Sequence, residues 1–183
     1  MTRPYTTAGR FEKIHDRLVV YTAISKTFNM AGLGSSCMMI PNPELKKKIS
    51  DSYDACWMFG PCDLAFTAME AAYTHGDAWV DQQLAYLEGN VETVNTFVAE
   101  HMPGVQVTKH EGTFLMWLDM TCFGKSSQEL TSILAKEYGL ALGDGSHYGT
   151  QAEGFMRLNI GCTRDTLIKG LEQMAVMYDK YVK

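Results

Sequence analysis

The chain has 183 residues, 46% of them hydrophobic and 20% charged, and this composition can bury a core and excludes a disordered chain. The 16 Lys and Arg residues against 21 Asp and Glu give a formal net charge of −5, opposite in sign to the basic surface that nucleic-acid binding needs. No run reaches the ~18 to 20 apolar residues of a membrane span, and the polar opening Met1–Pro4 lacks the apolar core of a signal peptide, so we expect a cytoplasmic protein without membrane or nucleic-acid partners.

Two short strands are predicted at the start of the chain. Leu18–Ile24 is a short apolar run rich in β-branched residues, which is typical of a buried strand. After a glycine-rich turn, Cys37–Ile40 forms a second strand that Pro41 closes. Two such strands make no core of their own. We therefore expect the first 40 residues to be the end of a larger sheet whose other strands are not in this chain.

Three helices are predicted next. They run from Glu44 to about Phe59, from Asp63 to Tyr73, and from Asp77 to His101, with Pro61 and Gly76 as the breaks. The third is the longest, because apolar residues recur along it at spacings of three and four. These residues are Leu84, Leu87, Val91, Val94 and Val98.

The remainder alternates strands and helices, which predicts a small α/β sandwich. The predicted strands are Val105–Thr108, Thr113–Leu118, Leu140–Leu142 and Phe155–Ile160, and the predicted helices are Gln128–Tyr138 and Asp165–Tyr181. Ser126 with Glu129 forms a capping-box pattern before the first helix, Gly139 stands at its expected end, and Thr163 is placed to cap the second.

Lys26 is the first candidate for chemistry. It directly follows a predicted strand and precedes a glycine-rich turn, and pockets form at such sheet ends. A desolvated amine there can form an imine with an aldehyde, although by position alone a solvated surface lysine is the more common outcome.

The neighbours of Lys26 carry a specific resemblance. Ser25–Leu33 reads S-K-T-F-N-M-A-G-L, which resembles the cofactor-lysine segment of pyridoxal-phosphate enzymes of the aspartate-aminotransferase fold type, above all the cystathionine β-lyase and C–S lyase branch. Glu111–Asp119 and Gly154–Arg164 resemble two further motifs of that branch, in the same order. The resemblance covers nearly the whole chain.

Arg157 is the second candidate. Strand alternation places Phe155, Arg157 and Asn159 on one face and Met156, Leu158 and Ile160 on the other, which we expect to face the core. A planar guanidinium suits two-point binding of a carboxylate, whereas a surface ion pair is the ordinary alternative. In the resembling family, the arginine of this motif holds the α-carboxylate of the substrate.

The resemblance implies an α/β fold: the C-terminal part of a PLP-binding large domain, residues 1–76, an inter-domain helix, residues 77–104, and a small C-terminal α/β domain, residues 105–183. It implies pyridoxal 5′-phosphate bound by Lys26 and Ser25, Lys26 as catalytic base, and Arg157 as the ligand of a small amino-acid substrate. The activity is a C–S β-lyase or an aminotransferase, and the sequence does not decide between them.

Other groups of the family's site have no counterpart in this sequence. They belong to an N-terminal half that is not part of this chain, and Gly34 stands eight residues after Lys26, where many relatives place a phosphate-binding arginine. The partners implied are a second copy in a homodimer or a complementing N-terminal half. A non-catalytic remnant or interaction domain, and one half of a split enzyme, are the alternatives.

The remaining residues predict little chemistry. His147 and Tyr148 lie in a loop that resembles the family's substrate entrance, although ordinary exposed loop residues are the more common outcome. No histidine has ligand spacing with a cysteine or an acid, so no metal site is expected. The five cysteines are scattered and read as reduced, mostly buried thiols.

Overall fold

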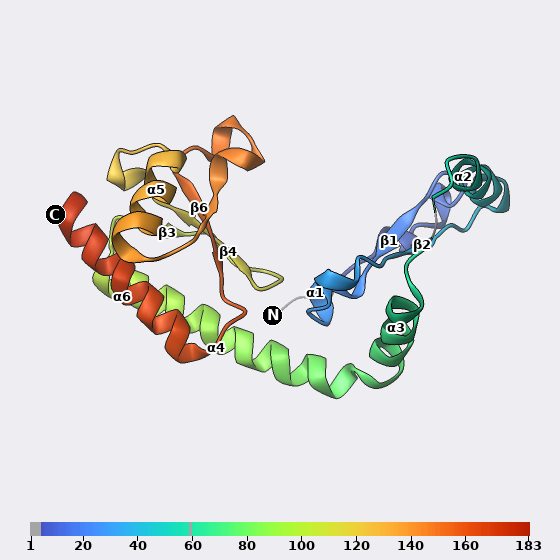
Figure 1. Cartoon of the computed structure of the whole chain (residues 1–183), viewed down its shortest axis with the longest axis horizontal. Coiled ribbons are helices and arrows are strands. Elements are labelled where there is room, and N and C mark those ends of the chain that lie inside the picture. The colour runs from blue at the N-terminus through green and yellow to red at the C-terminus, as the bar shows by residue number, and fades with distance from the viewer. Residues whose placement is uncertain (1–4, 59) are drawn as a thin grey trace. The chain divides into compact units, whose positions relative to one another are not determined.

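The computed structural model of the chain describes residues 5–58 and 60–183 (Figure 1); the opening Met1–Pro4 lies outside them. The chain divides into two compact units, with the boundary between Gln82 and Gln83. The predicted three-part division at residues 76 and 104 stays a prediction. No helix in the described part of the chain is long and apolar enough to cross a membrane.

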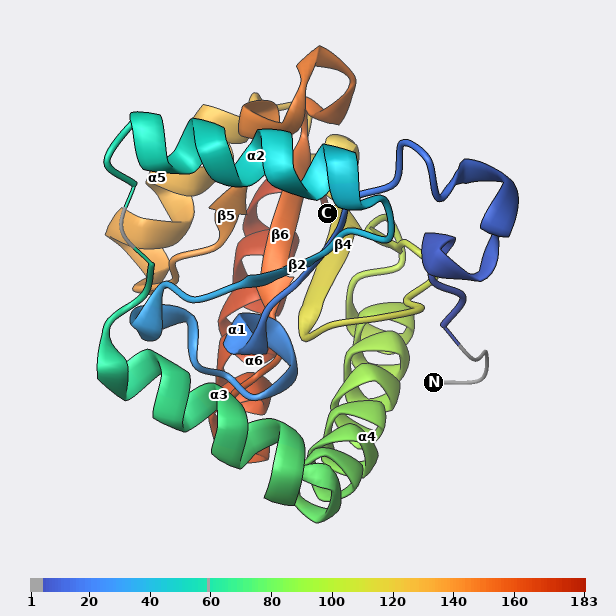
Figure 2. The same ribbon diagram turned by 90° about the vertical axis from the view of Figure 1, so that its right-hand side faces the viewer.

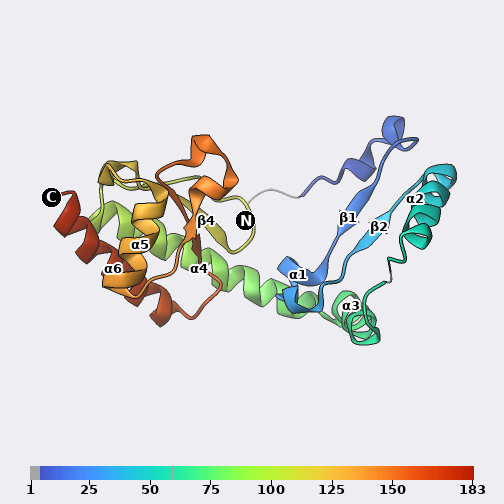
Figure 3. The same ribbon diagram turned by 45° about the horizontal axis from the view of Figure 1, so that its top comes forward.

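The first unit is built around two antiparallel strands, which run side by side in Figure 3. Val20 stands opposite Met39, and Thr22 opposite Cys37. The elements are the short helices η1 (Ala8–Arg10), η2 (Glu12–Ile14) and η3 (Ala31–Leu33), the strands β1 (Val20–Thr22) and β2 (Cys37–Met39), the helices α1 (Ile24–Thr27), α2 (Pro43–Ala55) and α3 (Asp63–His75), and the start of α4 (Asp77–His101).

The first strand differs from its prediction in length and burial. Only three residues of β2 pair with it, so the ladder stops at Thr22 and Ile24 begins the helix α1. The predicted burial holds at the two ends of the run, where Leu18 and Ile24 are buried, but it is wrong for Tyr21 between them, which is 61% exposed. No third strand of the described residues pairs with β1 or β2.

The predicted helices are present, with one shorter than expected. The side chain of Asn42 accepts hydrogen bonds from the backbone N–H groups of Glu44 and Leu45 and so begins α2. This helix ends at Ala55, because Trp57 adopts a left-handed backbone conformation with φ 51°; Phe59, its predicted end, lies outside the described residues. Helix α4 has the predicted bounds.

The second unit is a four-stranded antiparallel sheet in the order β3-β4-β6-β5. In Figure 2 the strands β4 and β6 stand in front of α6. The elements after α4 are the strands β3 (Gln106–Val107), β4 (Leu115–Asp119), β5 (Gly143–Asp144) and β6 (Phe155–Asn159), the helices α5 (Ser127–Tyr138) and α6 (Arg164–Tyr181), and the short helices η4 (Thr121–Phe123), η5 (Gly145–Tyr148) and η6 (Thr150–Ala152).

Alternation along the strands separates a core face from an open face. Met116 and Met156 are almost fully buried and pack with α4, α5 and α6 in the hydrophobic core of the unit. Trp117 and Arg157, the next residue of each strand, are only half-buried and lie on the opposite face. The predicted placement of Arg157 away from the core is therefore confirmed.

The prediction of a strand at Leu140–Leu142 is wrong. Gly139 ends α5 in a left-handed conformation, and the N–H of Leu140 donates back to the carbonyl of Leu134, so the chain is still leaving the helix there. Pairing with β6 starts only at Gly143, which stands opposite Arg157.

The predicted capping box of Ser126 and Glu129 is present at the start of α5. The carboxylate of Glu129 accepts hydrogen bonds from the backbone N–H and the hydroxyl of Ser126, and these bonds lower the pKa of the carboxyl.

Candidate functional site

Lys26 lies on the single helical turn α1, directly after β1. Its side chain is exposed and that of Ser25 is half-buried. Two buried neighbours anchor the turn: Ile24 is fully buried, and the ring of Phe28 meets Tyr73 edge-on at 5.7 Å and stacks on Trp79 at 6.2 Å. Lys26 is therefore an exposed residue on a turn that the buried side chains of Ile24 and Phe28 anchor.

The connection from α1 to β2 brings a further polar group to the same end of the strand pair. Ser35 lies just before Cys37, which pairs with Thr22 at the end of β1. Its hydroxyl is buried and finds no hydrogen-bond partner among the described residues, which is uncommon for a buried polar atom. Gly34, before it, has φ 58° with open space around its Cα, so a glycine suits this turn better than an arginine.

Arg157 is the centre of the open face of the second unit. It stands opposite Trp117 on one side and Gly143 on the other. A methyl group at Gly143 would lie 3.1 Å from Arg157 Nε, so the absence of a side chain there makes room for the arginine. In the part of the chain that the structure describes, no carboxylate lies within 4.0 Å of the guanidinium and no hydrogen bond joins it.

The two carboxylates nearest in the ladder are committed to their own turns. Asp119 Oδ1 accepts from the backbone N–H and the hydroxyl of Thr121, at 2.9 and 2.6 Å. Asp144 Oδ1 accepts likewise from Ser146, at 2.8 and 2.7 Å. Each acid stabilises a short helical turn, and neither forms an ion pair with Arg157.

An aromatic ring contacts Arg157 instead, and two further rings pack in the same cluster. The ring of Tyr148 lies 5.3 Å from its Cζ, a cation–π contact. Trp117 meets Tyr148 edge-on at 5.4 Å and stacks on Phe155 at 5.8 Å. His147 and Tyr148, predicted near the substrate entrance, are both exposed on η5, and Tyr148 contacts the predicted site residue Arg157.

Sequence reasoning missed the role of Asn90, a fully buried amide in the apolar stripe of α4. Its Nδ2 donates to the carbonyls of Ile160 and Cys162, at 2.8 and 3.2 Å, and its Oδ1 accepts from Arg164 Nε at 2.5 Å. The amide therefore holds the chain between β6 and α6. Its position inside an otherwise apolar helical stripe was a signal in the sequence, and Tyr86–Leu87 with Asn90 also resembles a stretch of the same family.

Replacing Asn90 by alanine should destabilise the protein by about 1–3 kcal/mol, because it removes the acceptor of Arg164 Nε and the donor to the carbonyls of Ile160 and Cys162. Thermal or urea unfolding measures the loss. Asn95, exposed on the same helix, is the matched control, and Asn95→Ala should leave stability nearly unchanged. Equal effects of the two substitutions would contradict this role.

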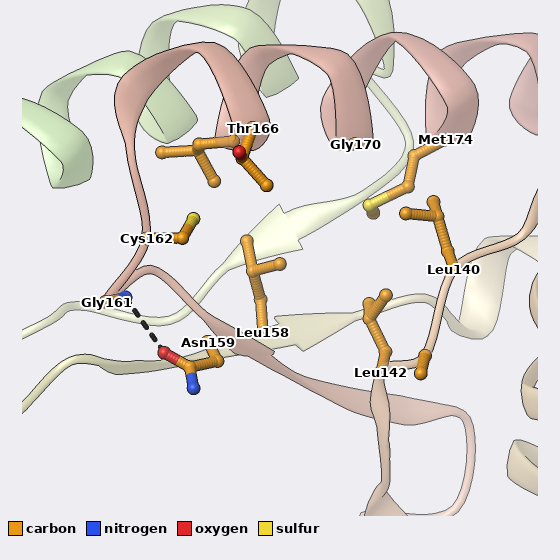
Figure 4. Close-up of a pocket in the computed structure, with 11 residues that line it drawn as sticks. Leu140, Leu142, Leu158, Asn159, Gly161, Cys162, Thr166, Gly170 and Met174 are labelled. Atoms are coloured by element: carbon orange, nitrogen blue, oxygen red, sulfur yellow. Dashed lines mark hydrogen bonds between the residues drawn. The ribbon is translucent and has the colours of Figure 1, made fainter.

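A pocket of about 260 Å³ opens in the second unit where the chain at 140–142 fails to pair with β6 (Figure 4). Its wall is mainly apolar, with Leu142, Leu158 and Met174, and Cys162 lies beside it. Burial raises the pKa of the Cys162 thiol. None of the predicted site residues lines this pocket.

The cysteines and the possible metal ligands are the remaining residues for which the sequence made a prediction. All five cysteines are free thiols, but the prediction that most are buried is wrong: Cys56 and Cys62 are exposed and the other three are half-buried. Within the described residues, no cluster of three His, Cys, Asp or Glu side chains could hold a metal ion.

Comparison with known proteins gives consistent results. The sequence model of the family "Aminotransferase class I and II" matches residues 3–174. Cystathionine beta-lyase PatB of Bacillus subtilis is 38% identical over 87% of this chain, and protein MalY of Escherichia coli is 32% identical over 82%. These alignments span 41% and 39% of the two relatives, so the chain covers about two fifths of their length.

Solved structures share the fold. A PLP-bound putative aminotransferase from Clostridium difficile 630 superposes with a TM-score of 0.87 at 32% identity, over 92% of this chain and 43% of that one. Cystalysin from Treponema denticola, which contains pyridoxal 5′-phosphate, gives a TM-score of 0.87 at 26% identity, over 95% and 44%. The predicted fold class, the C-terminal part of a fold-type-I enzyme, is thereby confirmed. The chain belongs to the aminotransferase class I and II family, and the relatives that it matches include cystathionine β-lyases.

Proposed function

We propose that the chain forms part of a PLP-dependent C–S β-lyase that acts on a small amino acid with sulfur on its β-carbon. Arg157 carries the proposal: it is a half-buried arginine on an open sheet face, and no carboxylate of the described residues forms an ion pair with it. Every α-amino acid brings a carboxylate, which a guanidinium binds through two parallel hydrogen bonds. The names of the relatives favour β-elimination over transamination.

The described residues fit the aldehyde side of pyridoxal 5′-phosphate. Lys26 is an exposed residue on α1, the turn that follows β1, and Ser25 lies beside it. The unpartnered hydroxyl of Ser35 is a spare hydrogen-bonding group at the same end of the strand pair. We assign Lys26 and Ser25 to cofactor binding on this basis.

In the proposed reaction, Arg157 binds the substrate and Lys26 transfers the proton. When bound, the cofactor supplies an electron-withdrawing ring that stabilises negative charge on the substrate α-carbon. Arg157 binds and orients the α-carboxylate. Lys26 Nζ removes the proton from the α-carbon of the substrate. The sulfur then leaves the β-carbon with the electron pair of the C–S bond and is protonated to a thiol.

The products distinguish this reaction from its alternatives. With pyridoxal 5′-phosphate and L-cystathionine, a lyase consumes one water and releases homocysteine, pyruvate and ammonium in equal amounts. A thiol reagent and a pyruvate assay follow both products. Formation of a keto acid only when an amino acceptor is added, without thiol, would overturn the lyase assignment in favour of an aminotransferase. If neither product forms even when the complementing N-terminal half is present, the chain would be a non-catalytic domain.

We also infer that the first unit is covered by a second protein surface, either another copy of the chain in a homodimer or a complementing N-terminal half. The side chains of Tyr21, Met39 and Trp57 are 61%, 52% and 77% exposed, and no third strand in the described part of the chain pairs with β1 or β2. Exposed strand edges beside apolar side chains favour association.

Light scattering on a size-exclusion column tests the association. The purified chain should elute as a dimer or larger species, and adding charge at the edge with Tyr21→Lys should shift it toward monomer. A monomer at high concentration would contradict the homodimer, and the absence of any complex with an added N-terminal half would then contradict the inference as a whole.

We also propose that the protein works in the cytoplasm. All five cysteines are free thiols, which is typical of proteins in a reducing compartment.

A further inference from the structure

We propose that Tyr148 is a positioning residue for Arg157, which presents the guanidinium to the carboxylate of the ligand. This inference rests on the proposed function, because it assigns a role within the same site. The ring of Tyr148 lies 5.3 Å from Arg157 Cζ, and no other contact with a charged group is recorded for either side chain within the described residues.

The place of the tyrosine is set by the strand that carries the arginine. Asp144 pairs with Met156, next to Arg157, and its carboxylate begins η5 by accepting from Ser146. Gly145 then passes so close to β6 that a methyl group on it would lie 2.3 Å from the carbonyl oxygen of Phe155. The turn is therefore fixed against β6, and Tyr148 at its end has a defined position over Arg157.

Trp117 supports the tyrosine from the sheet. It stands directly opposite Arg157 in the β4–β6 ladder and meets the Tyr148 ring edge-on, with an interplanar angle of 90°. Trp117 is itself stacked on Phe155. The three aromatic rings form a frame on the open face, with the guanidinium beside it.

A ring contact suits a binding arginine better than an ion pair does. An unrestrained arginine loses rotamer freedom when it captures a ligand, and that loss lowers affinity. A carboxylate from the protein would restrain it but would occupy its N–H donors and compete with the ligand. The face of an aromatic ring restrains the side chain and leaves the donors available.

The exposure of Tyr148 argues against a purely structural role. Its side chain is 56% exposed, so removing it leaves no buried cavity, and little stability depends on it. The loss expected from its removal therefore falls on ligand binding and not on folding.

The experiment follows the side-chain Nε–H signal of Arg157 by ¹⁵N NMR while L-alanine is added to the full chain. We expect a saturable shift that ethylamine, which lacks the carboxylate, does not produce. Tyr148→Leu keeps apolar bulk without an aromatic face and should weaken the apparent affinity about three- to tenfold. Tyr148→Phe keeps the ring and should restore the affinity lost in the leucine variant.

Each result has a distinct meaning. If Arg157 in the unmodified chain does not respond to L-alanine, its carboxylate-binding role fails, and the role of Tyr148 fails with it. If Arg157 responds equally in the unmodified chain and in Tyr148→Leu, Tyr148 is not a positioning residue, while the role of Arg157 stands. Tyr86→Leu is the matched control, because the Tyr86 ring lies 5.4 Å from Arg164 Cζ and its loss should not affect the Arg157 titration.

Discussion

Replacing Lys26 by alanine should lower turnover by at least about 10²- to 10⁴-fold, the contribution of a positioned general base, and should also abolish covalent attachment of the cofactor. Lys26→Arg should be equally inactive, since a guanidinium keeps the charge but neither forms the imine nor accepts the proton. The decisive measurement is borohydride reduction of the loaded protein followed by peptide mass spectrometry, which reports the attachment site without reference to activity.

Lys47 provides the control for this experiment. It is an exposed lysine whose Nζ forms a surface ion pair with Asp51 at 2.8 Å, within α2. Lys47→Ala should leave the labelled peptide and the turnover unchanged, because exposed pairs of this kind contribute little even to stability. Finding the reduced cofactor on any lysine other than Lys26 would refute the assignment.

Arg157→Ala should reduce kcat/KM toward an α-amino acid by about 30- to 5,000-fold, equivalent to the ~2 to 5 kcal/mol lost when one partner of a desolvated charge pair is removed. Arg157→Lys should recover only part of this, because a point charge replaces a two-pronged donor. Cofactor attachment should persist in both variants, since Lys26 and not Arg157 provides it.

Arg164 shows how a structural arginine should differ. Its side chain donates to Asn90 Oδ1 and to the carbonyl of Tyr86, and its backbone N–H donates to the hydroxyl of Tyr86. Arg164→Ala should therefore lower the melting temperature, with activity falling only in proportion to folded protein. An Arg157→Ala variant with the same behaviour and unchanged kinetics would eliminate the carboxylate-binding role.

Local patterns were sufficient to predict the presence of the long helices. The bounds of α4 follow from its apolar periodicity and from the glycine and proline on either side, and the capping box of Ser126 and Glu129 is a property of neighbouring residues alone. The β5 prediction failed because Leu140 and Leu142 are apolar enough for a strand, while pairing depends on where Gly139 releases the chain. Where a strand begins and ends depends on the neighbouring strand with which it pairs, and the local sequence does not show which strand that is.

The same distinction between local sequence patterns and contacts made by folding applies to the candidate site. Lys26 and Arg157 were identified because whole motifs resemble a known family, and spacing alone would have left both as surface residues. The bonds of Asn90 join residues 70 and 72 positions away, and the aromatic contacts of Arg157 depend on the register of three strands. Such contacts between distant residues emerge only once the chain is folded.

The bare Cα of Gly143 beneath Arg157 has an evolutionary consequence. Because any larger residue at position 143 would press on Arg157 Nε and Cβ, at 3.1 and 3.2 Å, the two positions should change together and not independently. Among relatives that retain the arginine, position 143 should stay glycine, and larger residues should enter there only in lineages that have given up the arginine. An alignment deep enough to score covariation would reveal this pairing.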